Sequence, residues 1–71
     1  MKTIEVKTSW HKANDKFAMS YKQYEYIKSL KTDDNCDWPF TSASNAMRSL
    51  TKRDASEIID ALNSDNKVII Q

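Results

Sequence analysis

The side chains best placed to bind a ligand are lysines and tyrosines in the segment after Ser20. Read as a helix, this segment puts Lys22 and Tyr26 one turn apart on its outward face, and it brings Tyr21 near Lys28 on another flank. Such pairs are typical of single-stranded nucleic-acid sites, because an aromatic ring stacks on a base and a lysine holds a phosphate. A solvated helix face, whose tyrosine rings cover the edge of a core, is the alternative explanation.

A second basic cluster consists of Arg48, Lys52 and Arg53. Lys52 and Arg53 fall in the first turn of a predicted helix, where the helix dipole disfavours positive charge. The free amides of that turn, together with these side chains, favour an anion such as phosphate. Asp54 and Glu57 offset the same positive field, so a solvated turn balanced by these acids is the alternative.

Few residue types in this chain suit catalysis or metal binding. The sequence has one cysteine, Cys36, and one histidine, His11, so neither an internal disulfide nor a Cys/His metal cluster is expected. Asp33, Asp34 and Asp37 surround the thiol and should raise its pKa, which is the wrong direction for a nucleophile. The three aspartates also lack the ligand number and the glycine of a calcium loop. We therefore expect no enzyme activity, no metal and no cofactor.

Length and composition set further bounds. The 71 residues carry a net charge of +1 and suffice for one small domain, residues 1–71. The chain has no glycine, which excludes glycine-rich phosphate loops and leaves Asn35, Asn63 and Asn66 as candidates for left-handed helix ends. The longest apolar run, residues 68–70, is too short to span a membrane. A single thiol and the lack of a signal peptide favour the cytoplasm.

Periodicity predicts the elements that hold these side chains. Apolar and polar residues alternate from Thr3 to Trp10, which indicates a half-buried strand, and residues 67–71 read as a final strand. Between them, residues 16–18 could return as a short second strand, and residues 32–40 form the main loop. Trp38 and Phe40 in that loop are expected to fold back onto the core.

Three helices are predicted from caps and apolar stripes. Ser20 and Gln23 have capping-box spacing for a helix that ends near residue 31. A second helix covers Ser42–Leu50, and a third is capped by Thr51, with Ser56 near its inner face. The predicted fold class is α+β, with three short helices and a small sheet made by the N- and C-terminal strands. The alternative is a three-helix bundle with an extended N-terminal arm.

Two stretches, QYEYIKSL from Gln23 and LTKRDASEIIDAL from Leu50, resemble a short helical module of phage and prophage proteins. The matching positions are Gln23, Tyr26, Ile27, Leu30, Leu50, Thr51, Lys52, Asp54, Ala55, Ser56, Ile59 and Leu62. Proteins with this module act in recombination and DNA metabolism or as small accessory proteins. Here an extra helix fills the spacer and a strand-like arm precedes the module. The resemblance implies a phage setting and a helical fold.

We therefore expect a non-enzymatic accessory protein that binds nucleic acid or a replication or recombination protein. The candidate binding residues are Lys22, Tyr26, Lys28, Arg48, Lys52 and Arg53. One alternative is an inhibitor of a host nuclease, polymerase or CRISPR-type effector that acts by protein contact, through an apolar patch or the acidic loop at residues 33–37. A second alternative is a self-associating structural protein, such as a homodimer, whose sheet edge pairs with a copy of itself.

Overall fold

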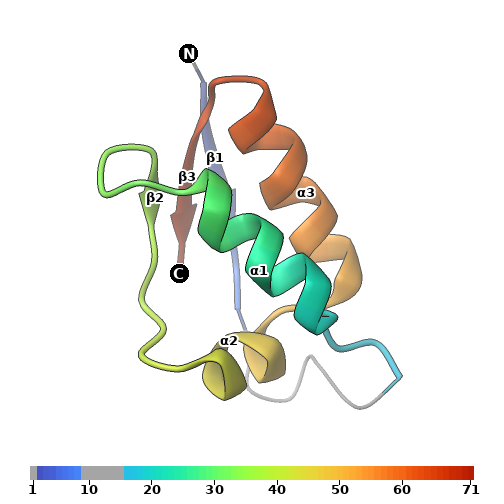
Figure 1. Ribbon diagram of the computed structural model, residues 1–71. Helices are drawn as coiled ribbons and strands as arrows, with labels where there is room; N and C mark the ends of the chain where they lie inside the picture. Colours follow the sequence, from blue (N-terminus) through green and yellow to red (C-terminus); the bar gives the residue numbers. More distant parts are fainter. Residues whose placement is uncertain (1, 9–15) are drawn as a thin grey trace.

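The three strands, far apart in the sequence, meet in one parallel sheet (Figure 1). The computed structural model describes residues 2–8 and 16–71. The elements in chain order are β1 (Thr3–Val6), α1 (Tyr21–Leu30), β2 (Cys36–Asp37), α2 (Ala43–Ser49), α3 (Lys52–Asn63) and β3 (Lys67–Ile70). The strand order is β1-β3-β2, so the C-terminal strand is central. The predicted α+β fold is confirmed.

One face of the sheet supplies part of the core. Its side chains are Val6, Cys36, Val68 and Ile70, all buried. Of the described helices, α3 contacts β1 and β3, while α1 packs against α3 and α2. Ile27 of α1 and Ile58 of α3 are fully buried. A single layer of helices therefore covers the sheet, and the opposite sheet face carries the exposed Thr3, Glu5 and Asp37.

The helix starts follow from local hydrogen bonds, as predicted. The Ser20 hydroxyl accepts from the Gln23 amide at 3.2 Å, and the Ser20 amide donates to the Gln23 side chain at 3.1 Å. Thr51 and Asp54 form the same reciprocal pair at the start of α3. Both capping boxes satisfy amides that a helix start would otherwise leave unpaired. Ser42 caps α2 through the amide of Asn45.

The end of α3 corrects one sequence prediction. Asp65, and none of the three asparagines, is the described residue with positive φ, at 65°. The Asn66 amide donates to the Ala61 carbonyl at 2.9 Å, and the Asp65 amide donates to the Leu62 carbonyl. This is the Schellman pattern, which needs a left-handed residue just after the helix. Aspartate tolerates this region better than most residues, so it serves where glycine is missing.

Three more predictions were wrong or incomplete. The loop at residues 32–40 contains β2, because Cys36 and Asp37 pair with Val68 and Ile69. Residues 16–18 do not return along β1; Ala18 instead pairs antiparallel with Thr51. Ser56 is exposed, not near the inner face of its helix. The end of the predicted first strand, at Trp10, lies outside the described residues, as does His11.

Candidate nucleic-acid interface

Four aromatic rings lie in a row along α1 and the segment after β2. Tyr21 and Tyr24 have ring centroids 5.9 Å apart, and Tyr24 and Trp38 are 6.3 Å apart. Trp38 and Phe40 meet edge to face, with centroids 4.9 Å apart and an angle of 79° between the planes. Such separations are typical of interacting rings. We call Tyr21, Tyr24, Trp38 and Phe40 the aromatic row.

The four rings are positioned by helix α1 and by the segment that follows strand β2. Tyr21 and Tyr24 are three residues apart on α1, so they share a face. Trp38 follows β2, which the Val68 amide fixes by donating to the Asn35 carbonyl at 2.8 Å. Pro39 keeps the backbone of the preceding residue extended. Trp38 and Phe40 are partly buried and pack against the core, which confirms their predicted position.

Two lysines lie over the row. The Lys28 ammonium is 5.6 Å from the centroid of the Tyr24 ring, and the Lys31 ammonium is 5.6 Å from that of Trp38. Each contact contributes roughly 0.5–1 kcal/mol at an exposed site. We call the row plus these two residues the aromatic–lysine surface. It combines ring faces and cations within one small area.

Acidic groups border this surface. The Glu25 carboxylate accepts a hydrogen bond from the Tyr21 hydroxyl, and this bond is the main reason why the pKa of Tyr21 is raised. Tyr21 itself is 58% exposed. Its ring is therefore open to a ligand. The described part of the chain contains no group of three or more His, Cys, Asp or Glu residues suited to a metal ion.

Cys36 lies beneath the same segment and is buried. Burial is the largest cause of its raised pKa; Lys31 opposes the shift and Asp37 adds to it. The predicted direction of the shift is thus confirmed, but its main cause is burial among apolar side chains, whereas the sequence had suggested acidic neighbours. The thiol acts as an apolar anchor for β2.

Of the six residues predicted from sequence, Lys28 belongs to the aromatic–lysine surface. Lys22 and Tyr26 are exposed on α1, and Tyr26 is 48% exposed. No ring contact is found for Tyr26 among the described residues. Lys22 and Tyr26 therefore lie on an outward face of α1 that is distinct from the aromatic row.

The other three predicted residues, Arg48, Lys52 and Arg53, are exposed around the start of α3. The Lys52 amide donates to the Phe17 carbonyl at 2.9 Å, and the Asp54 amide donates to the Thr51 hydroxyl at 3.1 Å. Arg53 Nε is 3.9 Å from a Glu57 carboxylate oxygen. Two amides of the first turn are therefore already bonded within the chain, which leaves less for an anion than the sequence suggested.

Sequence reasoning missed Tyr24, Lys31, Trp38 and Phe40 as binding residues. The contact between Tyr24 and Lys28 could have been predicted, since the two residues are separated by one helical turn. The contact between Lys31 and Trp38 could not have been predicted from sequence spacing, because the turn at residues 32–35 and strand β2 bring the two residues together. That turn depends on Thr32, whose hydroxyl accepts from the amides of Asp34 and Asn35.

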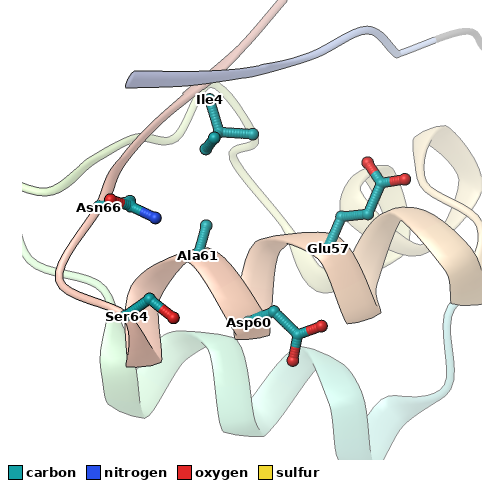
Figure 2. Close-up of a pocket in the computed structure, with 6 residues that line it drawn as sticks. All are labelled: Ile4, Glu57, Asp60, Ala61, Ser64 and Asn66. Carbon is teal, nitrogen blue, oxygen red and sulfur yellow. The ribbon is translucent and has the colours of Figure 1, made fainter. Parts of the chain in front are cut away.

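A shallow pocket of about 330 Å³ lies on a different part of the molecule, between β1 and α3 (Figure 2). It is lined by Ile4, Glu57, Asp60, Ala61, Ser64 and Asn66. Ile4 and Ala61 face each other across it, and the carboxylates of Glu57 and Asp60 are exposed on α3. The lining includes no residue of α1 or β2. Its acidic rim is unsuited to a polyanion.

Comparisons of the chain with protein-family models, curated proteins and solved structures found no match. Within residues 2–8 and 16–71, none of the helices has the length and apolar character needed to cross a bilayer.

Proposed function

We propose that this protein binds single-stranded nucleic acid through the aromatic–lysine surface and acts without catalysis. The observation that carries the proposal is the row of four rings, with neighbouring centroids 4.9 to 6.3 Å apart and two ammonium groups over it. A base stacks on an open ring face, and a lysine beside that ring meets the adjoining phosphate. Stacking of this kind is tolerant of sequence.

Single strands fit this surface better than duplexes. The bases of a duplex are stacked on one another, so their faces are closed to protein rings. The row offers ring faces and edges, with few of the side-chain amides that read base edges. The proposed ligand is therefore a single strand of DNA or RNA, bound with little base preference.

The proposed setting is a phage or prophage, with action in the host cytoplasm within DNA metabolism. This part rests on the similarity of residues 23–30 and 50–62 to the phage helical module. It leaves open whether the strand is bound alone or together with a replication or recombination protein.

The test is fluorescence anisotropy with a labelled oligothymidylate of about ten nucleotides, titrated at several salt concentrations. The charge reversal Lys28→Glu with Lys31→Glu should weaken binding at least about tenfold at low salt. It should also reduce the salt slope by about 0.7 for each lost phosphate contact. Tyr21→Ala, at an exposed ring, should weaken binding by stacking alone and leave the salt slope unchanged.

A matched control is available at the start of α3. Lys52→Glu with Arg53→Glu changes the net charge by the same amount and reverses two of the cations predicted from sequence. It should weaken binding far less than the Lys28 and Lys31 reversal. Equal losses in the two variants would mean that binding depends on the net charge of the protein and on no particular surface. Failure of the wild type to bind the oligonucleotide at low salt would refute the proposal.

A second candidate function, inhibition of a host enzyme by protein contact, is favoured by the pocket between β1 and α3. Its carboxylates on Glu57 and Asp60 suit a basic protein surface. Affinity capture from host lysate with and without nuclease separates the two candidates. A single stoichiometric protein that survives nuclease treatment, together with no oligonucleotide binding, would favour the inhibitor.

A further inference from the structure

The rings of the aromatic row are spaced for a single strand that is stretched out. Neighbouring centroids are 5.9 Å apart for Tyr21 and Tyr24, and 6.3 Å apart for Tyr24 and Trp38. Successive nucleotides of a stacked strand advance only about 3.4 Å along its axis. Bases that stack on neighbouring rings are therefore unstacked from one another, and each of these rings takes one base.

The fourth ring, Phe40, differs from the other three in its orientation. The ring planes of Tyr21 and Tyr24 differ by 32°, and those of Tyr24 and Trp38 differ by 45°. The planes of Trp38 and Phe40 differ by 79°, so a base that lies flat on Trp38 is nearly perpendicular to the Phe40 ring. Phe40 is also partly buried against the core. It therefore supports the Trp38 ring and does not continue the series of stacking faces.

The other end of the row, at Tyr21, is bordered by an acid. The Glu25 carboxylate accepts a hydrogen bond from the Tyr21 hydroxyl, so a negative charge lies beside this ring. A phosphate placed beyond Tyr21 would meet that charge, and like charges at short range repel. The series of stacking faces therefore begins at Tyr21 and ends at Trp38.

The ammonium groups match the phosphates of such a strand in number. Three nucleotides are joined by two phosphodiesters, and two ammonium groups, those of Lys28 and Lys31, lie over the row. An ammonium at an exposed site binds an aromatic ring less strongly than a stacked base does. A base that stacks on Tyr24 or Trp38 therefore displaces the lysine from the ring, and the ammonium moves to the adjoining phosphate.

We propose that the aromatic–lysine surface is a three-nucleotide site, an inference that rests on the proposed function. Tyr21, Tyr24 and Trp38 each stack one base. Lys28 and Lys31 hold the two phosphates that join the three nucleotides. The ligand class is therefore a short unpaired segment, such as a strand end, a gap or a loop, because a footprint of this length needs no long single strand.

The experiment is a competition series against the labelled oligothymidylate of about ten nucleotides. Unlabelled oligothymidylates of two to six nucleotides, without terminal phosphates, displace this probe from the wild-type protein. Affinity should rise at least about fivefold from two to three nucleotides, through one more stacked base and one more phosphate. From three to four nucleotides it should rise only about twofold, because the longer strand merely has a second position in which to bind. The salt slope for the trinucleotide should be about 1.4, at about 0.7 for each phosphate contact.

Tyr21→Ala removes the stacking face at one end and should convert the surface into a two-nucleotide site. This variant should bind the dinucleotide and the trinucleotide with affinities within about twofold of each other. Tyr26→Ala is the matched control, because Tyr26 is an exposed tyrosine on the same helix and lies outside the aromatic row. It should leave the whole length series unchanged. Circular dichroism checks that both variants are folded, and the wild-type series decides the matter without either of them.

The length series separates this proposal from the proposed function. If the labelled probe binds and affinity climbs evenly from two to six nucleotides, the three-nucleotide site is wrong while strand binding stands. A step from three to four nucleotides as large as that from two to three would assign a base to Phe40 and would also overturn the proposal. A probe that does not bind the wild type at low salt refutes the proposed function itself.

Discussion

The aromatic–lysine surface and the pocket beside β1 both lie where the core meets solvent, yet opposite chemistry borders them. On the first, ammonium groups of Lys28 and Lys31 lie over aromatic rings. On the second, the carboxylates of Glu57 and Asp60 lie beside the aliphatic side chains of Ile4 and Ala61. The net charge of +1 conceals this separation. The distribution of charge, more than its total, therefore determines which side of the molecule can bind a polyanion.

The two regions also differ in what supports them. The pocket is framed by α3 and by β1, which has β3 beside it along its full length. Trp38 and Phe40 follow a strand of only two residues, Cys36 and Asp37. Short strands with few ladder bonds open more readily. The aromatic side should therefore be the less stable of the two.

The largest effect is expected from Trp38→Ala. Trp38 contacts two rings and one ammonium group, so its removal breaks the row in the middle. We expect a loss of about 2 kcal/mol in the free energy of unfolding, below the range for a fully buried aromatic residue, and loss of oligonucleotide binding. Urea denaturation and anisotropy measure the two effects.

A matched substitution is available on the pocket side. Ile4→Ala, also at a half-buried side chain, should cost about 1 kcal/mol and leave oligonucleotide binding intact. Trp38→Phe should retain most of the stability and part of the binding, because a smaller ring still stacks. Similar binding losses for Ile4→Ala and Trp38→Ala would mean that folding alone, and no particular surface, controls binding.

A smaller effect is expected from alkaline pH through Cys36. Burial raises the pKa of this thiol above its ordinary value of 9.0, so the folded protein keeps the proton that the unfolded chain loses. This contribution to stability is complete below the pKa of the unfolded chain and is lost as the pH rises through the folded-state pKa. The urea midpoint should therefore fall above about pH 9 in the wild type, and fall less in Cys36→Ala. Identical pH profiles for the two proteins would contradict the role of the thiol.

The smallest effect is expected from the pocket acids. Glu57→Gln with Asp60→Asn removes two negative charges distant in sequence from the aromatic row. At low salt it should tighten oligonucleotide binding by less than about threefold, through the long-range field alone, and salt should abolish the gain. The free energy of unfolding should change by less than about 0.5 kcal/mol, since both side chains are exposed. A larger gain would show that these carboxylates lie close to the bound strand.

The helices were predictable because their signals are local. Ser20 with Gln23 and Thr51 with Asp54 are each three residues apart, and both pairs form the predicted bonds. The apolar stripe that predicts α3 includes Ala55 and Ile58, which are buried. The end of α3 was less predictable, because Asp65 in the left-handed region depends on how the chain must turn into β3.

The binding surface was predictable only in part. Lys28 was identified because helical spacing places it near aromatic residues. The predicted neighbour was Tyr21, whereas the ring beneath the Lys28 ammonium is that of Tyr24, which is half-buried and packs against the core as well. Trp38 was assigned to the core for a sound reason, its size on a polar loop, yet partial burial leaves it available to a ligand as well.

Local sequence patterns are enough to predict where the helices begin, which of their faces are apolar and that a final strand follows α3, because these features depend on neighbours within one or two turns. The tertiary structure decided that the strands run parallel, that β3 is central and that Lys31 meets Trp38. Those features join residues far apart, such as Thr3 with Lys67 and Cys36 with Val68. Closing such long loops costs conformational entropy that only the assembled core offsets, so no local pattern carries the information.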